Sequence, residues 1–215
     1  MTEARQPYSP KKKGRKFDDV VEGARQVFMR DGFEGANVDN IARAAGVSKA
    51  TLYSYFPDKS HLFQAVLTSE CARHAGAISE HLPEEVTLRE ILLNQCRFFT
   101  QFIMTDWAQE MFRVCMAEAR RFPELGRAFY EAGPDSMRGA LAEFLQTPEV
   151  QAELDIDDPY LAADQLKMLC HCDLFLKKMF GLIDGATDEE LERIAVSAVD
   201  VFLARYQRTT TNPQP

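Results

Sequence analysis

The hydrophobic residues of this chain recur with the 3.6-residue period of an α-helix almost from end to end. No segment alternates polar and apolar residues over the length that a strand needs. Gly, Pro and residues typical of helix N-caps divide the periodic sequence into segments. Of the 215 residues, 46% are hydrophobic, which is enough to fill a core. The pattern predicts an all-α protein of about nine helices.

The predicted helices differ strongly in length. The first covers residues 17–31, two very short ones cover 38–45 and 49–55, and a long one covers 58–81. Later helices are expected at 87–104, 107–121, 123–146 with a kink at Gly133 and Pro134, 159–182 and 188–207. Because short helices are unstable alone, packing must hold the second and third, which suggests that they present a surface. We predict a flexible arm (1–16), a head domain (17–62), a helical bundle domain (63–208) and a disordered tail (209–215).

Charge is divided unevenly along the chain, whose net charge is −8. Residues 1–60 hold 11 Lys or Arg against 8 Asp or Glu, a net charge of +3, which leaves −11 for the rest. The first sixteen residues are the most basic part, with Pro7, Pro10 and Gly14 opposing regular structure. Such an arm either adds DNA affinity by counterion release or is a solvated tail.

The cysteines and the hydropathy pattern indicate the compartment. The five cysteines are an odd number, scattered through apolar helical segments, and are expected to be reduced. The basic N-terminus lacks the apolar stretch of a secretory signal, and no stretch approaches the roughly 20 apolar residues of a membrane span. We therefore expect a cytoplasmic protein with no membrane partner.

The most informative stretch is NVDNIARAAGVSKATLYSYFPDK, residues 37–59. Asn37 and Ser48 are suited to cap the two short helices, and Gly46 lies where a sharp turn requires positive φ. Small and apolar side chains at helical spacing face inward and fix the crossing of the two helices. The pattern predicts a helix-turn-helix motif whose structural residues are Ile41, Ala42, Gly46, Val47, Leu52 and Phe56.

The outward face of the second short helix carries side chains suited to the major groove of DNA. The Lys49 ammonium can donate to guanine O6 or N7, and Ala50 can pack on a thymine methyl group. Hydroxyl groups can donate to phosphate, and Lys59 is expected to be a phosphate clamp. The predicted DNA-binding residues are Lys49, Ala50, Thr51, Tyr53, Ser54, Tyr55 and Lys59.

Two alternatives remain open for this face. Tyr53 and Tyr55 could instead be core aromatics, with Lys49 and Lys59 as solvated charges; the Tyr55 ring could also pack while its hydroxyl faces DNA. Asp39 is unfavourable beside phosphate, so it either accepts from a cytosine amino group or points away.

Residues 17–66 resemble the TetR family of repressors in the short helix, the Gly-Val-Ser turn, Thr-Leu-Tyr, an aromatic pair and the following Lys. The resemblance implies that Thr51, Tyr53, Tyr55 and Lys59 occupy DNA-contacting positions, and that Lys49 and Ala50 occupy variable base-facing ones. The stretch MAEARRFPELGRAFYEAGP, residues 116–134, resembles the C-terminal domain of the AefR-related subgroup.

The second half of the chain lacks the clustered acid, base and nucleophile of an enzyme but is rich in aromatic residues and methionine. Most of these are expected to be helical core, while the resemblance implies that some line the cavity of a small-molecule effector. The predicted lining is Phe98, Phe102, Met111, Phe112, Met116, Phe129 and Phe175.

Cys170, His171 and Cys172 have the side chains of a soft-metal site. On one helix, however, residues two apart point about 200° away from each other, so no metal or other cofactor is predicted. A catalytic pair of Cys115 and His171 lacks an orienting group and is not predicted either.

The last predicted helix is apolar on more than one side, which indicates burial against a partner. One stripe is Leu191, Ile194, Ala198 and Phe202, and a second is Val196, Val199 and Leu203. The resemblance implies a four-helix dimer interface built from the last two helices of each subunit, and the first stripe is predicted to form it. A two-fold dimer presents its recognition helices about 34–36 Å apart, so the operator should be pseudo-palindromic.

Together these observations predict a dimeric repressor that binds a DNA operator and is released by a small apolar or amphipathic ligand. The alternatives are a ligand-independent regulator or an activator. From a different class, the chain could be a helical metal-binding or enzymatic protein that keeps a vestigial helix-turn-helix.

Overall fold

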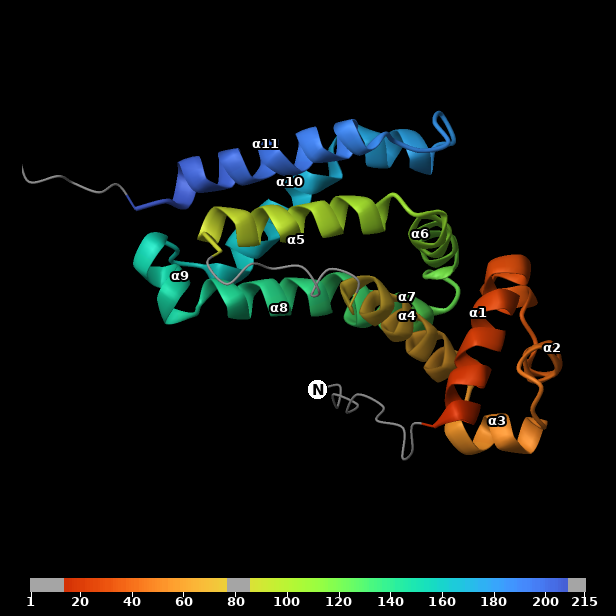
Figure 1. The fold of residues 1–215 in the computed structure, drawn as a ribbon. Coiled ribbons are helices and arrows are strands. Elements are labelled where there is room, and N and C mark those ends of the chain that lie inside the picture. The colour runs from red at the N-terminus through yellow and green to blue at the C-terminus, as the bar shows by residue number, and fades with distance from the viewer. Residues whose placement is uncertain (1–13, 77–85, 209–215) are drawn as a thin grey trace, which may run out of the picture. The chain divides into compact units, whose positions relative to one another are not determined.

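The computed structural model describes residues 14–76 and 86–208, and Figure 1 shows them as a succession of helices. Within these ranges the strand-like pairing consists of one antiparallel bridge between Leu154 and Gln207. The predicted all-α class is confirmed. No helix in the described ranges combines the length and hydropathy that crossing a bilayer requires. The predicted arm, apart from residues 14–16, and the predicted tail lie outside the described residues.

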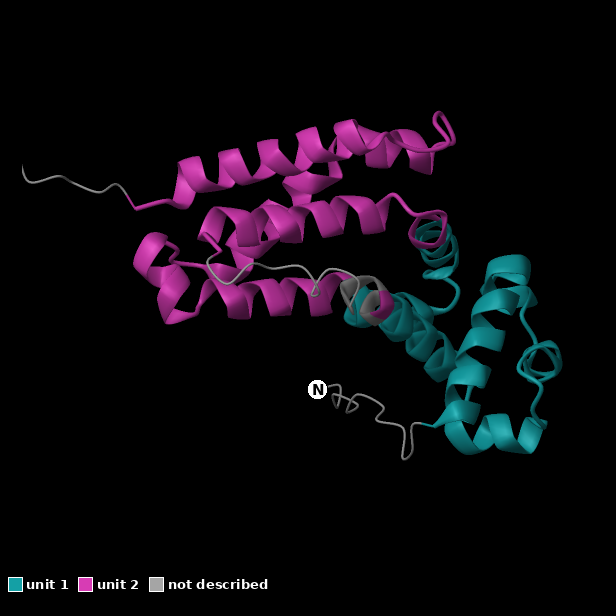
Figure 2. Ribbon diagram, viewed as in Figure 1, with its two compact units in different colours: residues 1–72, 110–133 teal, residues 73–109, 134–215 magenta. Residues whose placement is uncertain are grey.

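The chain divides into two compact units (Figure 2). The first unit comprises residues 1–72 and 110–133, and the second comprises 73–109 and 134–215. The first holds α1 (Arg15–Gly35), α2 (Val38–Ala44), α3 (Lys49–Tyr55) and α7 (Pro123–Tyr130), while α4 (Lys59–Gly76) and α6 (Asp106–Glu118) run through both. The second holds α5 (Leu88–Ile103), α8 (Ser136–Leu145), α9 (Pro148–Glu153), α10 (Pro159–Met179) and α11 (Asp188–Tyr206).

The first unit is built on an aromatic and aliphatic core. The apolar side chains of α1 are buried on one face, and Phe28 packs edge-on against Phe63 of α4 with ring centroids 5.2 Å apart. Phe33 lies between Phe63 and Phe122, at 5.4 and 5.8 Å, and Arg121 forms an ion pair with Glu34. Through these contacts residues 110–133, which the sequence assigned to the C-terminal domain, pack with the head instead.

The second unit is a helical bundle in which α11 packs along α5 and α10, and α10 also packs on α8. Thr87 with Glu90, and Thr187 with Glu190, form capping boxes that start α5 and α11. Two features of this unit differ from the sequence-based prediction. α9 is too short for a periodic signal, and α10 is interrupted at Cys172, whose φ is 41°. The predicted kink at Gly133 and Pro134 is present as a π-helical turn, Glu131–Asp135.

The stripe of α11 predicted to form a dimer interface is mostly used by the unit's own core. The exposed fractions of Ile194, Ala198 and Phe202 are 9%, 2% and 1%, and Leu191 is half-buried. Since α11 packs along α5 and α10 of the same subunit, these side chains mainly fill the subunit's own core. The prediction chose the wrong stripe, because periodicity alone does not tell a stripe facing the subunit's core from one facing a partner.

Candidate nucleic-acid interface

Local hydrogen bonds fix where α2 and α3 begin. The Asn37 side chain accepts from the Asn40 backbone N–H at 2.8 Å, and Ser48 Oγ accepts from the Thr51 N–H at 3.1 Å. Both are N-caps, which satisfy N–H groups that have no partner inside the helix. Gly46 has φ 64°, a conformation that costs a residue with a Cβ more than glycine. The N-caps fix where each helix begins, and Gly46 permits the turn between them.

The inward side of α3 anchors it to the head. Leu52 is 2% exposed and Phe56 is fully buried, as is Ile41 on α2, and Ala42 is 5% exposed. Val47 in the turn is half-buried. These side chains hold the opposite face of α3 at the surface.

The outward side of α3 exposes Lys49, Ala50, Tyr53 and Ser54. Tyr53 has 52% of its surface exposed, and the Ser54 hydroxyl donates to the Thr51 carbonyl at 2.6 Å. The flanking residues are partly engaged within the protein: Thr51 Oγ1 lies 2.9 Å from Ser48 Oγ, and the Tyr55 ring packs edge-on against Phe17 at 5.9 Å. The most exposed hydrogen-bonding groups of this face belong to Lys49 and Tyr53.

Asp39 of α2 forms an ion pair with Lys49 of α3. Both side chains are more than half exposed, at 55% and 58%. Asp39 therefore lies on the same side as Lys49, and its charge is paired.

Lys59 does not have the free ammonium group expected of a phosphate clamp. Its Nζ donates to the backbone carbonyls of Phe33, Glu34 and Ala36, at 2.5, 3.3 and 3.1 Å, and lies 4.5 Å from the centroid of the Phe33 ring. An ammonium group has three donors, so these carbonyls occupy all of them. Burial lowers the pKa of Lys59. In this structure Lys59 instead binds the carboxyl-terminal end of α1.

Replacing Lys59 by methionine is expected to lower the free energy of unfolding by about 1–3 kcal/mol, since part-buried carbonyls lose a charged donor. Urea unfolding followed by circular dichroism measures the loss. Lys16→Met is the matched control, because Lys16 is an exposed lysine of the same unit and its loss should leave the midpoint within error. If Lys59→Met kept full stability and lost only DNA affinity, the phosphate-clamp interpretation would be restored.

The predicted effector-lining residues are distributed over both units. Phe98 stacks on Phe102 at 6.0 Å in the second unit, and Phe112 meets Phe129 at 5.8 Å in the first. Met116 is 68% exposed. Met111 is buried in the first unit, while Phe175 lies 4.7 Å from His171 in the second.

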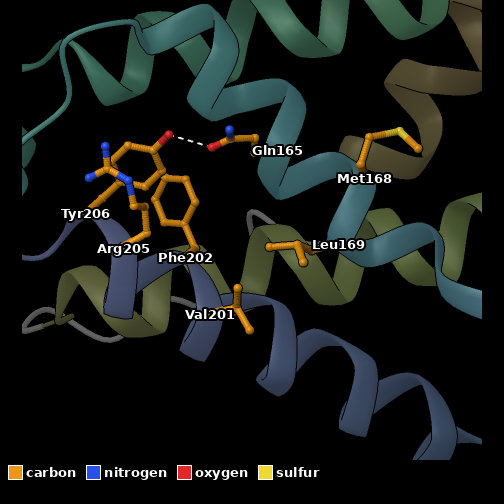
Figure 3. A pocket seen from close by; sticks show the side chains of 7 residues that line it. All are labelled: Gln165, Met168, Leu169, Val201, Phe202, Arg205 and Tyr206. Atoms are coloured by element: carbon orange, nitrogen blue, oxygen red, sulfur yellow. Dashed lines mark hydrogen bonds between the residues drawn. The ribbon is translucent and has the colours of Figure 1, made fainter.

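A pocket of about 390 Å³ lies between α10 and α11 (Figure 3), and none of the predicted effector residues lines it. Met168 and Val201, 63% and 51% exposed, contribute to its wall, and the Tyr206 hydroxyl donates to Gln165 Oε1 at 2.5 Å. The full lining is Gln165, Met168, Leu169, Val201, Phe202, Arg205 and Tyr206. The signal that could have found it is the set of apolar residues that α10 and α11 retain outside their core stripes.

The cysteines that the structure describes differ in exposure. Cys170 is buried and Cys172 is exposed, and the described residues contain no group of three or more His, Cys, Asp and Glu side chains placed to hold a metal ion. Burial raises the pKa of the Cys115 thiol to about 12, so it stays protonated. Cys115 and His171 belong to different units.

Comparison with protein families assigns both parts of the chain. Residues 20–66 match the model of bacterial regulatory proteins of the TetR family, and residues 90–208 match the C-terminal domain of AefR-like transcriptional repressors. The chain belongs to the TetR family. The earlier resemblance is thus confirmed for both halves, and the proteins of this family are transcriptional regulators, not enzymes.

Solved structures agree over nearly the whole chain. A TetR-family transcriptional regulator from Mesorhizobium loti is 31% identical, with a TM-score of 0.75, and the match covers 90% of this chain and 98% of that one. The flavonoid-responsive regulator FrrA is 36% identical, with a TM-score of 0.72, over 92% of this chain and all of that one.

The curated relatives match very different shares of the chain. The transcriptional repressor AcnR of Corynebacterium glutamicum is 38% identical over 63 residues, which are 29% of this chain and 34% of that protein. The chain thus spans about a third of that relative's length. The transcriptional repressor Rv1474c of Mycobacterium tuberculosis is 26% identical over 82% of this chain and 85% of its own.

Proposed function

We propose that this TetR-family protein is a transcriptional repressor that binds a pseudo-palindromic DNA operator as a homodimer and is released by a small ligand. The observation that carries the proposal is α3 itself. It is a capped helix anchored by Leu52, and it turns Lys49, Ala50 and Tyr53 to solvent. A short helix so exposed on one side is suited to the width of the major groove.

The side chains of α3 divide between two roles in this proposal. Lys49 and Ala50, on the first turn of α3, reach base edges. Tyr53, Thr51 and Tyr55 bind phosphate oxygens and thereby fix the register of the helix. Ser54 is less suited to a contact of its own, because its hydroxyl already donates to the Thr51 carbonyl.

Tyr53→Ala is expected to weaken operator binding by roughly 10- to 150-fold, the cost of a hydrogen bond to a charged phosphate. The operator is first selected by the full-length protein from a pool of random duplexes, and affinity is then measured by fluorescence anisotropy. Tyr130→Ala is the matched control: Tyr130 lies in α7 of the same unit and is also 52% exposed, and this variant should bind like the wild type.

A wild-type protein that selects no sequence from the pool would contradict the DNA-binding proposal. It would favour the rival class, a helical binding protein with a vestigial helix-turn-helix. A protein that selects an operator but binds it equally well after Tyr53→Ala would contradict only the role of Tyr53.

The dimer is proposed to form through the outer faces of α10 and α11. Exposed apolar side chains gather there, among them Leu161, Met168 and Val201, each more than half exposed. The pocket of Figure 3 lies within this face and would be filled by side chains of the second copy. Burial of such apolar surface is the dominant favourable contribution to stable association.

Repression and release are proposed with support from the names of relatives and from one pair of aromatic side chains. AcnR and Rv1474c are named repressors, which supports that sign of regulation here. FrrA is named flavonoid-responsive, and the stacked ring pair Phe98 and Phe102 is suited to a planar aromatic ligand. A coupling free energy of about 1–3 kcal/mol between ligand and operator would release DNA 5- to 150-fold. Titrating a flavonoid into the preformed protein–operator complex tests this step, and unchanged operator affinity would contradict it.

A further inference from the structure

An ion pair bridges the two helices of the helix-turn-helix on their exposed side. Asp39 is the second residue of α2 and Lys49 is the first residue of α3, and the Lys49 ammonium contacts Asp39 Oδ1. Neither side chain is buried by the protein, since each keeps more than half of its surface exposed. Both groups are therefore open to a ligand that approaches α3.

This pairing is unsuited to phosphate. A lysine that binds DNA through the backbone needs its charge free to replace a counterion, but here the charge is matched by a carboxylate in contact with it. A phosphate oxygen that approached Lys49 would also approach Asp39 and be repelled by it. The pair thus contributes little to non-specific DNA binding.

The same pairing is suited to the major-groove edge of a G·C base pair. Guanine presents the O6 and N7 acceptors there, and cytosine presents its N4 amino donor on the same edge. The Lys49 ammonium can donate to guanine while the Asp39 carboxylate accepts from cytosine. A G·C pair places two neighbouring acceptors before the amino donor, whereas an A·T pair places its amino donor between two acceptors. A fixed Lys49–Asp39 pair can therefore distinguish the two base pairs by the order of these groups.

We infer that Asp39 is a specificity-determining residue, which together with Lys49 reads one G·C base pair in each half-site. The inference rests on the proposed function, since it assumes that α3 enters the major groove. It assigns Asp39 two effects: it accepts a hydrogen bond from the correct base, and it withholds Lys49 from phosphates elsewhere on DNA.

The test compares full-length Asp39→Ala with the wild type, on the selected operator and on a random-sequence duplex. At one G·C position per half-site, the wild type should prefer G·C over A·T by roughly 5- to 150-fold, the range of a good base contact. Asp39→Ala should lose most of that preference. It should also bind the random duplex more tightly, with a logarithmic salt dependence steeper by about 0.9 per head, because Lys49 can then bind a phosphate.

Asp19→Ala is the matched control, because it removes the same charge from the head and lies on α1. It should leave the base preference intact. Lys49→Ala should relax the same position as Asp39→Ala, and relaxation of two different positions would show that the residues do not read one base pair. The inference is overturned if Asp39→Ala keeps the full preference for G·C over A·T. It is also overturned if the base preference and the salt dependence of Asp39→Ala equal those of Asp19→Ala. The proposed function fails separately, if the wild type selects no sequence at all.

Discussion

A protein that carries both Met168→Glu and Val201→Glu is expected to be monomeric and to bind the operator at least about 100-fold more weakly than the wild type. Both side chains are exposed in the subunit and line the pocket between α10 and α11 (Figure 3). In a symmetric dimer each substitution appears twice, so four carboxylates would be buried without partners. The cost of an unpaired buried charge, about 3–5 kcal/mol, exceeds what the remaining apolar contact can recover.

Analytical ultracentrifugation measures the oligomeric state, and anisotropy with the selected duplex measures the affinity. Met116→Glu is the control, because Met116 is 68% exposed but lies on α6 in the first unit. This variant should remain dimeric and bind normally. The helix content of each variant, from circular dichroism, checks that the subunit has folded. A folded double variant that stays dimeric would place the interface elsewhere.

The sequence was most informative where structure is determined locally. The bounds of the recognition helix, the caps at Asn37 and Ser48, and the positive φ of Gly46 all follow from chemistry within four residues along the chain. Sequence reasoning reached them because hydrogen-bonding side chains and glycine have few alternative uses at such positions.

The failures concern contacts between residues distant in sequence. Lys59 finds its carbonyl partners 23 to 26 residues earlier in the chain, and nothing near it signals that its charge is used inside the protein. The dimer stripe failed for a related reason. Ile194 and Val201 are both β-branched apolar residues of α11, and only the packing of α5 and α10 decides that Ile194 is core while Val201 is surface.

Gly23→Val is expected to lower the free energy of unfolding by about 3 kcal/mol or more. Gly23 lies in the middle of α1, a position where glycine usually destabilises a helix. Here a residue without a Cβ is needed, because the end of α2 packs directly against it. A Cβ at this position would lie 2.6 Å from the Ala45 nitrogen and 2.8 Å from its Cα. These are backbone atoms, so no side-chain rotation relieves the clash, and α2 must move away from α1.

Two further variants separate this clash from a general intolerance of valine. Ala45→Gly removes only the Cβ contact at 2.9 Å, so combining it with Gly23→Val should restore little of the lost stability. Gly139→Val, in α8, introduces a Cβ with no other atom within 4 Å and should cost less than about 1 kcal/mol. Urea unfolding of all three variants gives the comparison.

Because the end of α2 leads directly into the turn before α3, the displacement should also reorient Lys49 and weaken operator binding beyond the loss of folded protein. Equal stability of Gly23→Val and the wild type would show that the two helices can separate without cost, and the recognition helix would then need another support.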